Sequence, residues 1–138
     1  MADEPLHAYE LDGEVEPQCL ERIHELMGRL WSAEPSVTSE DRDMFATAVA
    51  EVAGNIVQHA AAQESIRFKL RLCVHRDQVE ALFSDNGGAA DIDLAAASLP
   101  ADLAESGRGL ALARAAADVQ YNRVCSANQW RVVRRRTP

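Results

Sequence analysis

The sequence predicts an α+β protein built as a two-layer sandwich, with helices on one face of a mostly antiparallel sheet. Three observations predict this class. Apolar residues recur at helical spacing through the first half of the chain, and from residue 66 they alternate with polar residues instead. The alternating stretches come in pairs joined by short turns, as in antiparallel hairpins. The 138 residues are enough for one compact domain and too few for two ordinary ones.

Two helices are expected in the first half, after a short edge strand at residues 6–12. The first helix spans residues 17–31, where apolar positions recur every three or four residues. The second spans about residues 40–61, and either Thr38 or Ser39 is expected to cap it. Its apolar stripe predicts the face that packs on the sheet. The members of this stripe are Phe45, Val49, Val52, Ile56 and Ala60.

The hydrophobic period then changes to that of strands. Residues 66–74 alternate apolar and mostly basic side chains, which predicts a strand with one buried face. After the turn "HRDQ", residues 79–85 form its antiparallel partner, with Glu80 opposite the basic outer face. A second hairpin ends the chain and is expected to turn around Ala127 and Asn128.

The segment between the two hairpins divides into a loop and a helix. Residues 86–106 combine glycines, alanines and a proline, so we expect a mobile loop with at most one helical turn. The stretch "GRGLALARAAAD" then predicts an Ala-rich helix that opens with its glycines and ends near Asp118.

Composition narrows the class of function. The chain is 47% hydrophobic and 26% charged, as expected of a globular protein. Its net charge of -8 argues against direct nucleic-acid binding and against an anionic membrane surface. A basic cluster at the C-terminus runs against this balance, and it is either a solvated tail or a contact for an acidic partner. Its members are Arg131, Arg134, Arg135 and Arg136.

The cysteines and the N-terminus indicate a cytoplasmic protein. No apolar run approaches the roughly 20 residues that cross a bilayer, and "MADEPLHAYE" lacks the order of a signal peptide. Cys19, Cys73 and Cys125 show no CxxC or Cys/His ligand spacing, so we expect reduced, mostly buried thiols. A metal site built from protein ligands alone is not expected.

Three polar segments are candidates for a ligand site. Glu51, Asn55 and His59 form a row along the second helix, where a carboxylate can act as a base and an amide oxygen can ligate Mg²⁺. The stretch "FSDNGGA" ends a strand in an aspartate, which can accept a hydrogen bond from an amine beside an open glycine backbone. In "ESGRGLAL", glycines at a helix start can cradle an anion. Alone, each segment also has an interpretation without a ligand. The row on the helix is then a polar helix edge, "FSDNGGA" a strand-ending turn and "ESGRGLAL" a glycine-rich helix entry.

In this order along the chain, "EVAGNIVQHA", "DNGG" and "GRGLALARAAAD" resemble the N, G1 and G2 boxes of the GHKL ATPase superfamily, whose nucleotide site is the Bergerat fold. The short length, "GRGL" and the trailing "D-V-x-Y" look most like its anti-sigma factor, serine-protein kinase branch. The resemblance implies one ATP-binding domain over residues 1–138, with a histidine-kinase-like ATPase fold over about 17–136 and an ATP lid at 88–106.

The resemblance also implies a role for each matching residue. Glu51 matches the carboxylate that activates the attacking hydroxyl, and Asn55 the residue that holds Mg²⁺ against the phosphates. Asp85 matches the carboxylate that reads adenine, and Gly87 the glycine beside the base. The sequence departs from the usual Asp-x-Gly-x-Gly at position 89, which is alanine. The implied phosphate-binding residues are Gly107, Arg108, Gly109 and Leu110.

The implied activity is phosphoryl transfer from ATP to a serine of a STAS-type anti-sigma factor antagonist. The same protein, as a homodimer, would sequester a sigma factor. An alternative is a nucleotide-binding regulatory protein that sequesters a partner without kinase activity. A third interpretation is a structural α+β domain in which the three polar segments coincide by chance.

Overall fold

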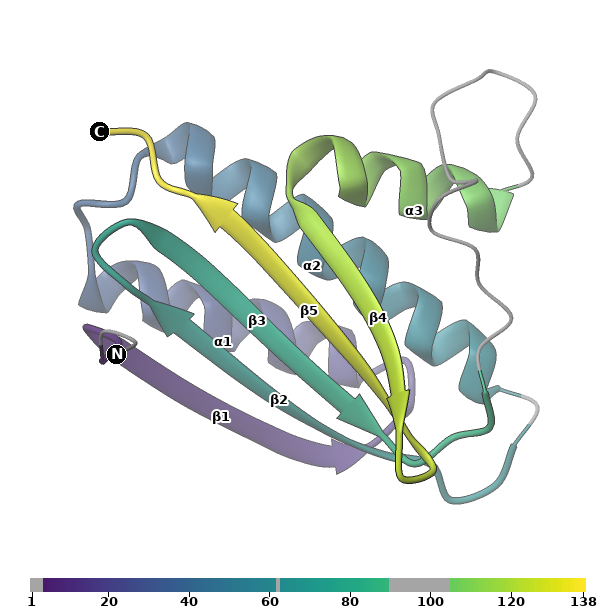
Figure 1. Cartoon of the computed structure of the whole chain (residues 1–138). Helices are drawn as coiled ribbons and strands as arrows, with labels where there is room; N and C mark the ends of the chain where they lie inside the picture. Colours follow the sequence, from purple (N-terminus) through teal and green to yellow (C-terminus); the bar gives the residue numbers. More distant parts are fainter. Residues whose placement is uncertain (1–3, 62, 90–104) are drawn as a thin grey trace.

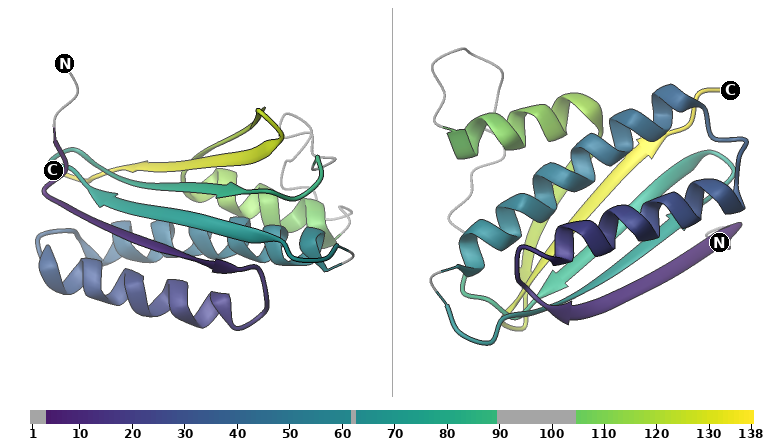
Figure 2. Two further views of the ribbon diagram at one scale, coloured as in Figure 1. Left: turned by 90° about the horizontal axis from the view of Figure 1, so that it is seen from below. Right: turned by 180° about the vertical axis from the view of Figure 1, so that it is seen from behind.

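The computed structural model describes residues 4–61, 63–89 and 105–138. Within these residues the elements follow in the order β1 (His7–Glu14), α1 (Cys19–Ala33), α2 (Ser39–Ala60), β2 (Arg67–Val74), β3 (Gln78–Asp85), α3 (Glu105–Ala116), β4 (Asp118–Val124) and β5 (Ala127–Arg135). The strands form one sheet in the order β1-β2-β3-β5-β4, and these pairings are all antiparallel. The three helices cover one face of this sheet (Figures 1 and 2), so the predicted α+β sandwich is confirmed. None of the described helices has the length and apolar character needed to span a membrane.

The first two helices begin and end close to the predicted residues. Thr38, one of the two expected caps, accepts a hydrogen bond from the backbone N–H of Asp41 at 3.2 Å through its side chain. This bond satisfies one of the N–H groups that a helix start leaves without a partner. The short strand expected near the N-terminus is present as β1, and it forms one edge of the sheet beside β2.

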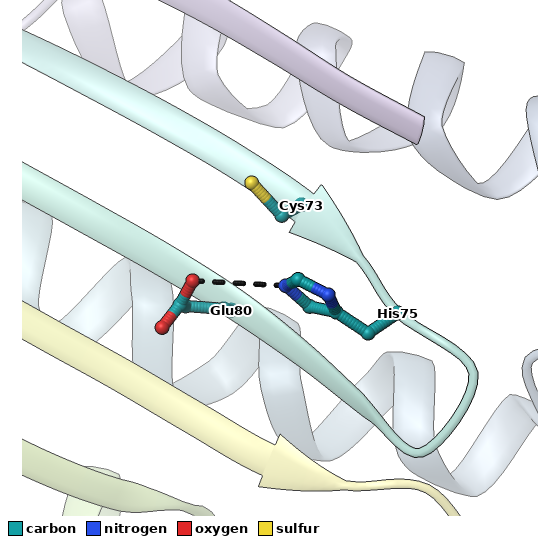
Figure 3. A group of neighbouring side chains, drawn as sticks. All are labelled: Cys73, His75 and Glu80. Carbon is teal, nitrogen blue, oxygen red and sulfur yellow. Dashed lines mark ion pairs between the residues drawn. The ribbon is translucent and has the colours of Figure 1, made fainter. Parts of the chain in front are cut away.

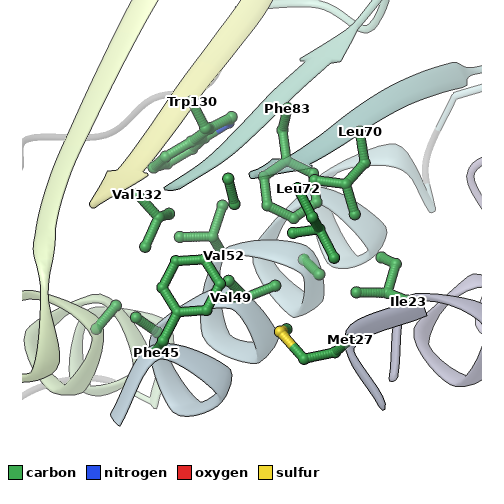
Figure 4. Packing of buried hydrophobic residues seen from close by; sticks show 14 of the residues in the cluster. Ile23, Met27, Phe45, Val49, Val52, Leu70, Leu72, Phe83, Trp130 and Val132 are labelled. Atoms are coloured by element: carbon green, nitrogen blue, oxygen red, sulfur yellow. The ribbon is translucent and has the colours of Figure 1, made fainter. Parts of the chain in front are cut away.

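The core lies between the helices and the inner face of the sheet. Phe45, Val49 and Val52 of α2 project toward the sheet, where they meet side chains of the central strands (Figure 4). Alternation in β2 turns Leu70 and Leu72 to this face, and both are fully buried. The apolar stripe therefore fixes the rotation of α2, and this rotation decides where the polar edge of the helix points.

The second hairpin turns at a different place from the one predicted. Its two-residue turn consists of Cys125 and Ser126, while Ala127 already pairs with Val124 inside the ladder. Both turn residues have positive φ, 50° and 66°, which is the backbone that matches the twist of two-residue hairpins. Cys125 is exposed at this tip, whereas Cys19 and Cys73 are buried. Asn128 therefore lies in β5 and not in a turn.

The charged outer face is also paired differently from the prediction. Glu80 lies opposite Cys73 of β2 and Val133 of β5. Its carboxylate binds Arg131 of β5, with 2.6 Å between Nε and Oε2. The register instead places the basic residues of β2 opposite acidic residues of β1. The facing pairs are Arg67 and Glu14, Lys69 and Asp12, and Arg71 and Glu10.

The C-terminal arginines do not form a solvated tail, because most of them make contacts within the fold. Arg134 places its Nε 2.9 Å from Oδ1 of Asp41, and its NH1 donates to the carbonyl of Ala116 at 3.0 Å. Ala116 is the last residue of α3, so this guanidinium also neutralises the negative end of that helix. Arg136 donates to the carbonyl of His75 at 2.9 Å. The arginine cluster thus connects the end of β5 to α2, to α3 and to the β2–β3 turn.

Asp41 is the centre of this arrangement. Its side chain is fully buried, and it also accepts the backbone N–H of Thr137 at 2.7 Å. Burial alone would raise the pKa of Asp41, but the hydrogen bonds from Thr137 and Arg134 outweigh it and lower the pKa below its ordinary value. The charged form of Asp41 is therefore the one that stabilises the fold.

Replacing Asp41 by asparagine is expected to lower the free energy of unfolding by about 3 kcal/mol at neutral pH, because it removes the counter-ion of a half-buried arginine. Since the folded-state pKa is lowered, the stabilisation is present above the unfolded pKa of about 3.9 and is lost as the pH falls through the folded value. Urea denaturation of both proteins over this pH range measures the difference. Asp43→Asn, an exposed position on the same helix, is the control and should change stability by less than about 0.5 kcal/mol. Equal stability of the two variants would contradict the assignment.

Candidate nucleotide site

The polar edge of α2 carries three of the residues singled out by sequence. Glu51, Asn55 and His59 lie one turn apart on this helix, and all three are half-buried. Three of the residues between them, Val52, Ala53 and Ile56, are buried in the core. The row therefore runs along the border between the core and the surface, where a ligand can reach it.

The first residue of the row meets α3. A Cβ atom placed on Gly109 would lie only 2.6 Å from Oε2 of Glu51. The Glu51 carboxylate therefore occupies the space that a side chain at position 109 would fill, and any larger residue there must push this carboxylate aside. The structure thus brings together Glu51 and Gly109, which are 58 positions apart in the sequence.

The start of α3 differs from the prediction by two residues. The helix begins at Glu105, so Gly107 and Arg108 lie inside its first turn and Gly109 begins the second. The N–H groups of a first helical turn have no partner within the helix, and they favour an anion. Leu110 is 6% exposed and packs in the hydrophobic core, so its side chain contributes to packing. The greater part of the expected lid, residues 90–104, lies outside the described residues.

The strand-ending aspartate is held in one orientation. Asp85 is 6% exposed at the end of β3, and its Oδ1 accepts the N–H of Gly87 at 2.9 Å. This bond across two residues is the aspartate turn that the sequence "DNG" favours. The same oxygen also accepts a hydrogen bond from Nδ2 of Asn128 at 2.9 Å. Gly87 is buried directly against the carboxylate.

Asn128 is a residue of this site that the sequence did not reveal. It is 1% exposed on the inner face of β5, and its Nδ2 also donates to the carbonyl of Gly88 at 2.8 Å. Its Oδ1 accepts hydrogen bonds from Arg123, at 3.0 Å, and from the hydroxyl of Tyr121. A buried carboxamide in an otherwise apolar alternation is a recognisable signal, but only once the preceding turn is placed correctly.

The end of α2 holds the same loop from the other side. His59 Nε2 lies 3.1 Å from the carbonyl oxygen of Gly88, and the N–H of Gly88 donates to Oε1 of Gln63 at 2.7 Å. Gln63 in turn donates to the carbonyl of His59 at 3.2 Å. His59, for which no chemistry was predicted, therefore links the row on α2 to the loop after β3. The row on α2 thus contacts both other polar segments. Glu51 meets the start of α3 at Gly109, and His59 meets the loop after β3 at Gly88.

A helix-on-sheet sandwich with a carboxylate and an amide on the central helix, beside a glycine at the start of α3, defines the class of Bergerat-type nucleotide-binding domains. A family profile described as a histidine kinase-like ATPase domain matches residues 16–134. The chain belongs to this family, within the GHKL superfamily. A comparison with curated proteins finds no match. Family membership gives the chain an ATP-binding, regulatory role.

Replacing Gly109 by alanine is expected to weaken Mg-ATP binding about 10-fold without destabilising the fold. The added Cβ must displace the Glu51 carboxylate, which is the flexible end of a side chain, while alanine favours the helix by about 0.5–1 kcal/mol. Calorimetric titration and urea denaturation measure the two effects. Gly28→Ala on α1, where a Cβ meets open space, should bring the same gain in stability and leave ATP binding unchanged. Wild-type affinity in Gly109→Ala would argue against a role for this contact.

Replacing Asn128 by alanine is expected to lower the free energy of unfolding by about 2–3 kcal/mol, because Asp85 and Gly88 lose a buried hydrogen-bond donor. The control is Asn122→Ala, an exposed position on β4, which should cost less than about 0.5 kcal/mol. Thermal and urea unfolding of both variants provide the comparison. If the two substitutions cost the same, Asn128 does not hold the loop.

Proposed function

We propose that this protein is an ATP-dependent serine-protein kinase of the anti-sigma factor type. It phosphorylates a STAS-type anti-sigma factor antagonist and sequesters a sigma factor. The observation that supports this function best is the contact between Glu51 and α3 at Gly109. It provides a carboxylate base beside the helix start that we assign to the ATP phosphates. The wording "GRGL" and "D-V-x-Y" favours this branch of the superfamily.

In this proposal each part of the site has one task. Glu51 acts as the general base that accepts the proton of the attacking serine hydroxyl. It lies beside the first turns of α3, which we assign to the ATP phosphates. The N–H groups in the first turn of α3 stabilise the phosphate charge. Asp85, oriented by Gly87 and Asn128, accepts a hydrogen bond from the exocyclic amine of adenine. Gly87 brings bare backbone beside the Asp85 carboxylate, where we place the flat base.

The row on α2 also fits a magnesium ion. Mg²⁺ prefers oxygen ligands, and Asn55 offers an amide oxygen one turn from the Glu51 carboxylate. We assign Asn55 to hold the ion together with the nucleotide phosphates. Bound there, Mg²⁺ would neutralise the charge of the transferred phosphoryl group.

We further propose that residues 1–138 act as one ATP-binding domain in a cytoplasmic homodimer, with the open face of the sheet as the dimer surface. A groove of about 620 Å³ lies on this face, and Leu82 is among its lining residues. Acidic Glu10 of β1 and basic Lys69 and Arg71 of β2 border the groove. A two-fold axis would pair this patch with the same patch of the second copy, as in other symmetric dimers.

Replacing Glu51 by glutamine tests the kinase assignment. The variant keeps the shape of the side chain and loses the base, so transfer of labelled phosphate from ATP to STAS-domain proteins of the source organism should fall about 100-fold or more. Mg-ATP affinity, measured by calorimetry, should stay close to that of the wild type. The matched control is Glu40→Gln in the first turn of the same helix, which should transfer phosphate at the wild-type rate.

The outcomes separate the candidate functions. Transfer that survives Glu51→Gln unchanged would remove Glu51 from its role as base. Mg-ATP binding with no transfer by the wild-type chain would favour the alternative, a nucleotide-binding regulatory protein that sequesters a partner without kinase activity. Absence of ATP binding would contradict the site as a whole.

A further inference from the structure

A second cluster of reactive side chains lies far from the candidate nucleotide site. Cys73, His75 and Glu80 come together at the β2–β3 hairpin (Figure 3). The sulfur, one imidazole nitrogen and one carboxylate oxygen all lie within 4.8 Å of one another. The cluster is five positions along β3 from Asp85, about 17 Å, and on the opposite face of the sheet.

The hairpin register explains why these three residues meet. Cys73 and Glu80 are direct cross-strand partners on the outer face of the sheet. His75 leaves β2 where the turn begins, and its N–H donates to the carbonyl of Gln78 at 2.8 Å. Cys73 and Glu80 are only seven positions apart, but their proximity becomes visible only when the two strands are paired. The cysteines were expected to have no Cys/His ligand spacing. The cluster includes a carboxylate from the neighbouring strand, which a search for such spacing does not find.

The surroundings orient the ligand atoms. Arg131 binds Oε2 of Glu80 at 2.6 Å, while Oε1 lies 3.8 Å from Nε2 of His75, too long for a hydrogen bond. Arg136 donates to the carbonyl of His75 and fixes the turn backbone. The side chains of His75 and Glu80 are only 16% and 13% exposed, and Cys73 is 2% exposed. In metal sites, the ligands are oriented by hydrogen bonds of this kind, here from Arg131 to Glu80 and from Arg136 to the backbone of His75.

We propose that Cys73, His75 and Glu80 bind a divalent transition-metal ion of the Zn²⁺ type. Thiolate, imidazole and carboxylate are the ligands of protein zinc sites, whereas Mg²⁺ takes oxygen ligands. With metal–ligand bonds of about 2.0–2.3 Å, tetrahedral ligand atoms lie about 3.3–3.6 Å apart. Rotation of the His75 and Glu80 side chains that moves their ligand atoms by about 1 Å brings the observed cluster to this size.

The charges of the cluster suit such an ion. Thiolate and carboxylate together neutralise a divalent cation, and Arg131 remains bound to the second oxygen of Glu80. Burial raises the pKa of the Cys73 thiol; Glu80 of β3 and Glu10 of β1 raise it further, while Arg71 of β2 lowers it. The metal binds the thiolate, so binding releases the thiol proton to solvent.

Cobalt titration of the full chain tests this site. After reduction and removal of adventitious metal, the wild-type protein should bind one equivalent of Co²⁺ with a sulfur-to-metal charge-transfer band, and Zn²⁺ should displace it. Cys73→Ser should abolish the band. His75→Ala, a turn position outside the core, should lower the affinity at least about 10-fold and tests the site independently of any folding defect in the cysteine variant.

Matched controls exist for both ligand types. Cys125→Ser in the β4–β5 turn and His24→Ala on the exposed side of α1 should leave the spectrum and affinity unchanged. Mg-ATP affinity should be the same in all of these variants, because the cluster and the nucleotide site are separate. The proposal is overturned if the wild-type protein binds no stoichiometric Co²⁺, if the band survives Cys73→Ser, or if His75→Ala binds as tightly as the wild type.

Discussion

The close approach of α2 and α3 is the constraint on which the rest of this site depends. Gly109 lies so near the Glu51 carboxylate that a single added carbon would be 2.6 Å from it. The approach has this geometry because Phe45, Val49 and Val52 fill the space over the sheet and fix the rotation of α2. The polar row is then forced to the edge that meets α3. Core packing thus positions the Glu51 carboxylate against α3.

The loop after β3 is positioned by a different kind of interaction. Here hydrogen bonds from two distant elements hold the Asp85 side chain and the backbone of Gly88. Asn128 of β5 binds Asp85 and Gly88, while His59 and Gln63 at the end of α2 bind Gly88 from the opposite side. Polar networks of this kind are costly unless every member is satisfied, and they then specify one arrangement. The fold therefore combines apolar packing at the Glu51 end of the row with a polar clamp at its His59 end.

Sequence reasoning succeeded where the signal is local. Helical spacing and strand alternation predicted all eight described elements in the observed order, and the N-cap Thr38 was one of two candidates. It was wrong at the second hairpin, because Cys125 and Ser126 carry positive φ without the usual asparagine or glycine. It left the C-terminal arginines as either a solvated tail or a contact for an acidic partner and missed their contacts within the fold, since the partner of Arg134 lies 93 positions away. The clamp by Asn128 spans 43 positions and is invisible without the pairing of β3 with β5.

The tip of the β4–β5 hairpin offers a site for selective chemical labelling. Cys125 is the exposed thiol of the three, and the other two are shielded by the fold. Two residues before it, Arg123 donates to the carbonyl of Gly87 at 3.0 Å. A maleimide fluorophore would therefore attach at this single position on the native protein, without mutagenesis. Its emission would report rearrangements of the adjoining loop in real time, as an optical sensor built from the unaltered chain.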